Sequence, residues 1–176
     1  MRRFKNILLG VAITGAMLPL GGCLKGAADD YEEWRDRNDE YIASIPAGEY
    51  EIVVPDWAPR NSVYIKWHND RSLTANNMVA MSTSTVDIKY ELEDIEGNNL
   101  GNSYSAKDSV YRSCPNQNIL GMWIAMTTMH VGDSATLIIP YTSGYGKETR
   151  GSIKPYTNLI YRVKIKSIPD FEKPHN

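Results

Sequence analysis

The 176-residue chain has few of the residues on which covalent and metal chemistry depends, with two cysteines and three histidines. His68, His130 and His175 lie far apart in the sequence, and no group of His, Cys and carboxylate residues has the spacing of metal ligands. The chain also lacks a Gly-x-Ser-x-Gly nucleophile motif and a phosphate-binding glycine loop. We therefore expect no metal, no cofactor and no hydrolase chemistry.

An excess of charge of either sign is also missing. There are 19 Lys and Arg residues against 21 Asp and Glu residues, a net charge of −2. No basic run interleaves with aromatic residues beyond the N-terminus, so the sequence predicts no nucleic-acid partner. Internal repeats and low-complexity segments are absent, and the length suits one domain with attachments. The carboxylates of Glu91, Glu93, Asp94 and Glu96 are expected to face water.

The N-terminus has the layout of a bacterial lipoprotein signal. Arg2, Arg3 and Lys5 form a basic head, residues 7–20 are apolar or small, and Leu-Gly-Gly precedes Cys23. We expect residues 1–22 to be a lipoprotein signal peptide and Cys23 to be the lipidated N-terminus of the mature chain. The alternatives are an ordinary signal peptide with an incidental cysteine, or a membrane helix, for which the run is short of the usual span of about 20 residues.

Lipidation of Cys23 has two consequences for the rest of the chain. The protein would be exported and held at a bacterial membrane without spanning it, on the periplasmic face or the cell surface. Cys114 would then be the one remaining cysteine, so no disulfide framework is expected. With no neighbouring base in the sequence, Cys114 is predicted to be a small, inert residue at a strand end.

Residues 23–85 are predicted to form a tether, a helix and a β extension. Residues 23–45 hold the tether and an amphipathic helix over 31–45, which the Pro-Ala-Gly sequence at 46–48 ends. Residues 46–85 form an N-terminal β extension with strands over 49–54 and 62–68. These strands either add to a sheet edge or cover it. Met78, Val79 and Met81 are the expected buried points of the irregular segment that follows.

Residues 86–168 are predicted to form the main domain. Apolar residues alternate with polar ones over 86–93, 134–139 and 159–166, the pattern of half-buried strands. Between the first two strands, a helix carries apolar residues at i, i+3, i+4 and i+7 from Met122, and Asn116 or Asn118 is placed to cap it. The fold class is α+β, a twisted antiparallel sheet wrapped around one short helix, with residues 169–176 as a tail.

Three motifs in this domain occur in an order that resembles one family. They are the helix segment 115–129, the Gly-Tyr-Gly corner at 144–146 and the Ile-Lys-Pro loop at 153–155. Over residues 86–168 the chain resembles the FK506-binding-protein (FKBP) type of peptidyl-prolyl isomerases, as a divergent, Bacteroidetes-like bacterial lipoprotein.

The resemblance implies a pocket and gives its residues roles. In this family, the Tyr145 hydroxyl would reach a ligand carbonyl and the backbone N–H of Ile119 would bind the ligand, which makes these two the implied catalytic residues. The implied substrate-binding residues are Tyr90, Leu100, Met122, Ile153 and Tyr161. Taken singly, each of these could instead be an ordinary packing residue.

The sequence departs from the family at three pocket positions. Leu100 and Gly101 stand where the family pattern has Phe and Asp, and the missing Asp normally holds the pocket's donors in place. Met122 stands where the family has a Trp floor. Trp123 comes one residue late, which is about 100° around a helix. At Tyr161 the family usually has Phe, so the aromatic ring is kept there.

Prolyl isomerisation needs little more than such a pocket. The barrier to rotating the imide bond is about 18–20 kcal/mol and comes from resonance. A dry site with a few donors favours the twisted state without a covalent step. The expected partner is a proline-containing peptide or an unfolded envelope protein. One hypothesis is an isomerase or folding factor with weakened activity; the other is a non-catalytic binding or scaffold module of the same fold.

Overall fold

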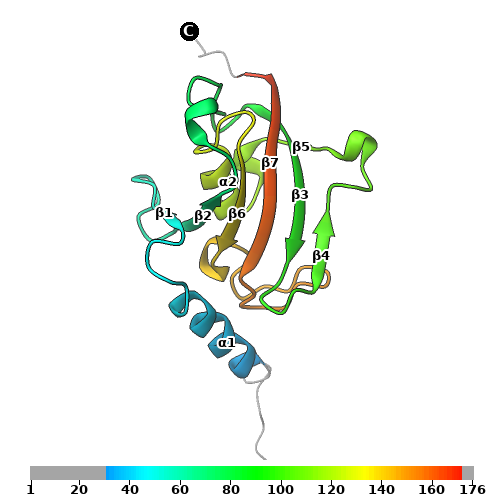
Figure 1. Cartoon of the computed structure of the whole chain (residues 1–176). Helices are drawn as coiled ribbons and strands as arrows, with labels where there is room; N and C mark the ends of the chain where they lie inside the picture. Colours follow the sequence, from blue (N-terminus) through cyan, green and yellow to red (C-terminus); the bar gives the residue numbers. More distant parts are fainter. Residues whose placement is uncertain (1–30, 172–176) are drawn as a thin grey trace, which may run out of the picture.

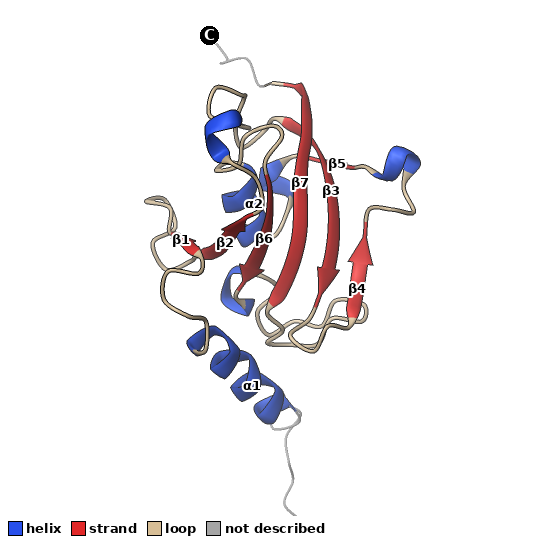
Figure 2. Cartoon of the chain, in the orientation of Figure 1, coloured by secondary structure: helices blue, strands red, loops and turns tan. Residues whose placement is uncertain are grey.

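The computed structural model describes residues 31–171, so Cys23, the signal peptide and the last five residues lie outside the described part. A single antiparallel sheet has helix α2 on one face, and helix α1 lies below one end of the sheet (Figures 1 and 2). The strand order is β1-β2-β6-β7-β3-β4, and β5 also pairs with β3. The predicted α+β fold is confirmed.

The elements are joined by connections of different lengths, of which residues 68–84 and residues 140–158 are the longest. The two α-helices and seven strands of the described part are α1 (Glu32–Ala43), β1 (Glu51–Val53), β2 (Val63–Trp67), β3 (Thr85–Glu93), β4 (Asn99–Asn102), β5 (Tyr111–Ser113), α2 (Leu120–Met126), β6 (Ser134–Ile139) and β7 (Leu159–Asp170). Three-residue 3₁₀ turns, such as η2 (Arg71–Leu73), occur between them. In this part of the chain, no helix has the length and apolarity needed to cross a membrane.

Strand β7 forms the middle of the sheet, as its strict alternation predicts. It pairs with β6 on one side and with β3 on the other. Leu159, Tyr161, Val163 and Ile165 are buried, whereas Arg162, Lys164 and Lys166 are exposed. The buried face points towards α2, because one face of an antiparallel sheet packs on the core and the other faces water.

Helix α2 packs on this buried face through Met122, Ala125 and Met126, all at most 3% exposed. A Cβ on Gly121 would overlap the Ile139 side chain, so glycine lets the helix approach β6 closely. The predicted asparagine cap is wrong. The helix begins after Ile119 with no side-chain cap, and the Asn118 amide instead donates to Ser113 Oγ and the Cys114 carbonyl.

Two other predictions about burial are wrong. Met78 and Met81 are 52% and 43% exposed, because Val79 bridges to His130 and the extended backbone turns Ala80 inward instead. Asp94 is only 6% exposed rather than solvated. Its carboxylate accepts hydrogen bonds from the backbone N–H groups of Glu96 and Asn98, so it closes the β3–β4 hairpin turn.

The strands before Val86 add to the sheet edge, one of the two roles predicted for them. β2 pairs with β6 from Tyr64 opposite Ile138 to Trp67 opposite Ala135, and β1 pairs with the other side of β2. Val63 and Ile65 are fully buried in the same core as α2. Residues from Glu51 onwards are therefore part of the same packed unit as the strands that follow.

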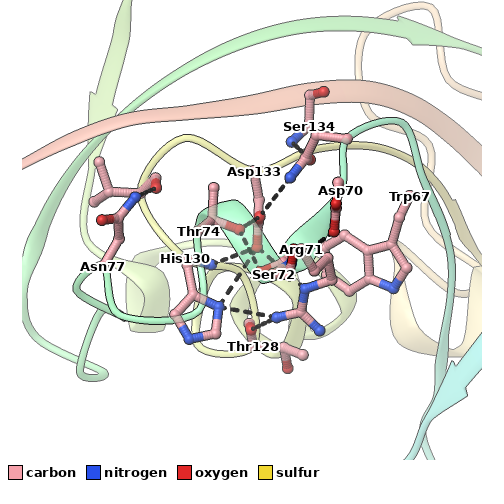
Figure 3. Close-up of polar contacts among 12 residues, drawn as sticks. Trp67, Asp70, Arg71, Ser72, Thr74, Asn77, Thr128, His130, Asp133 and Ser134 are labelled. Atoms are coloured by element: carbon pink, nitrogen blue, oxygen red, sulfur yellow. Dashed lines mark hydrogen bonds and ion pairs between the residues drawn. The ribbon is translucent and has the colours of Figure 1, made fainter.

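A buried carboxylate holds the segment after β2 in place (Figure 3). Asp133 is fully buried in the turn before β6 and accepts hydrogen bonds from Thr74 Oγ1 at 2.5 Å, Asn69 Nδ2 at 3.1 Å and the His130 backbone N–H at 2.8 Å. Burial alone would raise the pKa of Asp133, but these bonds together with the nearby Arg71 hold its pKa below the usual value.

Arg71 supplies the positive charge beside Asp133. Its Nε lies 3.5 Å from Asp133 Oδ2, its guanidinium stacks 3.9 Å from the Trp67 ring centroid, and its NH2 group contacts His130 Nδ1 at 2.9 Å. Segments 67–74 and 128–134 are thereby joined by one polar network at the end of the sheet (Figure 3).

Candidate functional site

A cavity of about 230 Å³ opens where α2, β3, β4, β5 and the loops after β6 meet. The residues that line it are uncharged and mostly aromatic or aliphatic, namely Ile88, Tyr90, Leu92, Leu100, Gly101, Tyr111, Asn118, Met122, Tyr145, Ile153 and Tyr161. An apolar cavity of about 150 Å³ admits a benzene molecule, so this one has room for a five-membered ring and one further group.

Six of the seven residues expected at the pocket line this cavity. They come from four elements and from two places in the connection between β6 and β7. Tyr90 lies in β3, Leu100 in β4, Met122 in α2 and Tyr161 in β7, whereas Tyr145 and Ile153 lie near the start and the end of that connection. Ile119 lies at an adjoining outer cavity of about 450 Å³, together with Gln117, Glu148 and Arg150. The structure thus brings together residues 71 positions apart in the sequence.

Three tyrosine rings form one wall of the inner cavity. The centroid of Tyr90 lies 5.6 Å from that of Tyr161 and 5.7 Å from that of Tyr111, the latter in an edge-to-face arrangement. Burial raises the pKa of the Tyr161 hydroxyl well above its usual value, and burial also raises that of Tyr90. Both phenols are therefore neutral at physiological pH and keep their protons as hydrogen-bond donors.

The three departures from the family pattern all lie at this cavity. Leu100, Gly101 and Met122 line it, so no carboxylate and no indole faces the inner space. Trp123 does not replace the missing floor, as its position one residue late predicts. Its ring lies against that of Trp57, with the centroids 4.6 Å apart and the planes tilted by 35°, and its Nε1 donates to Ser82 Oγ.

The cysteine and the histidines of the described residues do not line this cavity. Cys114 follows β5 as a half-buried free thiol, at the strand end where it is predicted. His68 is exposed and bonded to Thr136, and His130 belongs to the Asp133 network. Within residues 31–171, no nucleophile with a base beside it faces the cavity. The cavity is suited to binding and desolvating a ligand.

Tyr111 is the main pocket residue that the sequence did not predict. It lies in a three-residue strand opposite Ile88, where its neighbours are Val110 and Arg112. A strand of three residues is too short to show an alternation of apolar and polar residues in the sequence. Its position one strand from Tyr90 becomes apparent only from the pairing of β5 with β3.

Helix α1 fixes both loops that reach into the cavity. The fully buried Asn38 accepts a hydrogen bond from the Asn158 backbone N–H at 2.8 Å, and Asn158 Oδ1 in turn accepts from the Tyr141 N–H at 2.9 Å. The indole of Trp34 donates to Thr157 Oγ1 at 3.0 Å. Tyr145 follows Tyr141 in one loop, and Ile153 precedes Thr157 in the other, so α1 holds both.

We expect Asn38→Ala to loosen these loops, because it leaves the Asn158 N–H without a partner in a buried site. The cost of about 2 kcal/mol corresponds to roughly thirtyfold faster amide exchange at Asn158 and its neighbours. Hydrogen exchange measured by mass spectrometry over 141–158 tests this. Glu40→Ala, an exposed change on the same helix, is the matched control. Equal exchange in both variants would contradict the role of Asn38.

Comparison with known proteins supports one family and its fold. The family model for FKBP-type peptidyl-prolyl cis-trans isomerase matches residues 77–166, just over half of the chain. A peptidyl-prolyl cis-trans isomerase from Pseudomonas syringae pv. tomato has a similar structure, with a TM-score of 0.63 and 17% identity over 78% of this chain and 94% of that one.

FkpA from Escherichia coli is also similar in structure. The TM-score is 0.61 with 17% identity, and the match covers 83% of this chain but only 62% of FkpA. No curated protein matches the sequence significantly. Structural similarity at 17% sequence identity supports the fold. The family match supports a common ancestry with this family.

Proposed function

Because the chain belongs to the family of FKBP-type peptidyl-prolyl cis-trans isomerases, we propose that its cavity binds proline-containing segments of unfolded cell-envelope proteins. The protein is then an isomerase or folding factor with weakened activity. The observation that carries this proposal is the convergence of Tyr90, Tyr145, Ile153 and Tyr161 on one uncharged cavity large enough for a proline ring.

The weakened activity is argued from the three altered positions. Catalysis by twisting an imide requires donors that are already oriented towards the developing charge. With Gly101 in place of a carboxylate, no acidic group at the inner cavity orients the Tyr90 or Tyr145 hydroxyl. Met122 closes the floor with a flexible thioether, which fills space but orients a ring less firmly than an indole does.

The same three positions favour the second candidate, a binding or scaffold module without turnover. A cavity that holds the prolyl segment equally well in its planar and twisted forms gives binding without rate enhancement. Under this alternative, the chain retains proline-containing partners at the membrane and does not accelerate their isomerisation.

The isomerase assay separates the two candidates. Purified chain from residue 29 onwards is tested for acceleration of cis-to-trans conversion in an Ala-Leu-Pro-Phe peptide. We expect a measurable rate that falls at least fivefold in Tyr145→Phe and in Ile153→Ala, since each loses a direct ligand contact worth about 1 kcal/mol. A rate at micromolar protein that equals the rate in buffer alone would rule out the enzyme and leave the binding module.

We also propose that the protein is exported and held by a lipid on Cys23. The support is the basic head, the apolar run and the Leu-Gly-Gly sequence before Cys23. We expect Cys23→Ala to move the protein from the membrane to the soluble fraction of fractionated cells, because the acyl chains are its membrane attachment. Cys114→Ala is the matched control and should stay with the membranes. Continued membrane association of Cys23→Ala would count against lipidation.

A further inference from the structure

The solvent face of the sheet carries a row of residues that is basic and has no acidic member. Lys89 on β3 lies directly opposite Lys164 on β7, and Lys164 lies opposite Ser134 on β6. The backbone N–H of His68, just after β2, donates to the Ser134 carbonyl and extends the row. Lys166 follows on the same face of β7. We call Lys89, Lys164 and Lys166 the lysine patch; it lies on the face of the sheet opposite α2.

The acidic residues on this face are already paired with other cations. Arg162 lies 3.3 Å from Glu91 and 2.7 Å from Glu93, and Arg112 lies 2.6 Å from Asp87. Within residues 31–171, the three lysines of the patch form no ion pair with any carboxylate. This part of the face therefore has a surplus of positive charge that the protein itself does not balance.

The placement of the patch indicates an anionic partner. Like charges directly opposite each other on neighbouring strands repel, so Lys89 and Lys164 oppose the pairing of β3 with β7. Both strands are interior strands of the sheet, where lysines have no edge to protect against pairing with other chains. A hollow of about 300 Å³ is lined by Lys89, Lys164 and Arg162. An anionic oxygen in it accepts charge-assisted hydrogen bonds from the two ammonium groups.

The length of chain before the described residues favours a membrane surface as that anion. Eight residue steps separate Cys23 from Tyr31, at most about 29 Å of extended chain. A lipid on Cys23 therefore holds the sheet close to the phosphates of the lipid headgroups. The tether leads into α1, which lies below one end of the sheet (Figure 1). The tether alone leaves the sheet free to lie along the membrane or to stand away from it.

We propose that the lysine patch docks on anionic lipid headgroups and lays the solvent face of the sheet along the membrane. The cavity lies on the side of the sheet that faces α2, so docking leaves it open to segments arriving from the aqueous phase. This inference rests on the proposed lipid on Cys23 and is independent of the prolyl site. Each lysine near an anionic surface adds about a fivefold preference for the docked orientation.

Lysine acetylation of the lipidated chain in vesicles tests the orientation. The chain is inserted into vesicles of phosphatidylcholine, or of phosphatidylcholine and phosphatidylglycerol in equal parts, and labelling is followed by mass spectrometry. We expect Lys164 and Lys166 to be labelled at least fivefold more slowly in the anionic vesicles. Lys147, in the connection between β6 and β7, should react equally in both. The difference should disappear in 1 M salt, where the Debye length is about 3 Å.

Two double variants separate the patch from the overall charge of the chain. Lys89→Gln with Lys164→Gln should let Lys166 react in anionic vesicles nearly as fast as in neutral ones. Arg60→Gln with Lys147→Gln removes the same charge from exposed positions outside the patch and should leave Lys166 protected. Protection of Lys166 that survives the first double variant would overturn the role of the patch.

The remaining outcomes distinguish this inference from the anchor on which it rests. Equal labelling of the wild type in the two kinds of vesicle overturns the docked orientation and leaves the anchor in place. Protection of the patch by inorganic phosphate or an acidic peptide in neutral vesicles identifies a soluble anion as the ligand and overturns the membrane as the partner. Failure of the chain to float with neutral vesicles overturns the lipid anchor itself.

Discussion

We expect Asp133→Asn to lower the free energy of unfolding by about 3 kcal/mol, because it removes the charge that balances Arg71 inside a buried network. The amide still accepts one or two of the present bonds, but one of its two oxygens becomes an NH2 group facing donors. The Nε of Arg71 already has no hydrogen-bond partner. Chemical denaturation followed by tryptophan fluorescence measures the loss, and the exposed change Asp36→Asn is the matched control.

The same substitution should change how stability depends on pH. The folded pKa of Asp133 is below its ordinary value of 3.8, so its contribution is fully present above that value. The contribution is lost as the pH falls through the lower, folded pKa. Asp87, whose pKa the bond from Arg112 lowers, acts in the same range and is present in both proteins. The wild type and Asp133→Asn should therefore converge in stability on acidification; a constant difference down to about pH 2 would contradict this account.

The largest effect on activity is expected from restoring the pocket with Leu100→Phe, Gly101→Asp and Met122→Trp together. An indole floor and a phenyl wall hold the proline ring more rigidly, and the carboxylate orients the neighbouring tyrosine hydroxyls. We expect kcat/KM for the Ala-Leu-Pro-Phe peptide to rise at least tenfold, equivalent to about 1.4 kcal/mol of transition-state stabilisation.

The structure has room for these changes. A Cβ at Gly101 meets no atom within 4 Å, although its φ of 159° requires a modest backbone rotation to suit aspartate. Met122 borders the cavity, so the larger indole extends into empty space. Leu73→Phe and Met81→Trp, which repeat two of the substitutions at exposed sites, are matched controls. An unchanged rate in the folded triple variant would mean that these positions are not where activity was lost.

Much of the fold could be predicted because local pattern and global structure agree. The alternation of Leu159, Tyr161 and Val163 with polar residues predicts a strand with one buried face, and β7 is such a strand. The pocket residues could be named because their order along the chain resembles one family. Their roles at the cavity are still predictions, although six of them meet there.

The parts that the sequence could not predict depend on pairs of residues far apart in the chain. Asn38 resembles any polar residue on a surface helix until Asn158, 120 positions later, is placed beside it. Asp94 resembles a solvated carboxylate because nothing in composition shows that it folds back onto its own turn. Met78 and Met81 are apolar, yet the bridge between Val79 and His130 decides which side of that segment faces the core.

The central claim is that the uncharged cavity recognises proline-containing segments. Its most direct test is an NMR titration of the isotope-labelled protein with Ala-Leu-Pro-Phe and with a control peptide in which glycine replaces proline. We predict that the proline peptide shifts the backbone resonances of Ile119, Tyr145 and Ile153, and that the glycine peptide leaves them in place. Equal shifts with both peptides, or shifts confined to residues away from the cavity, would contradict the claim.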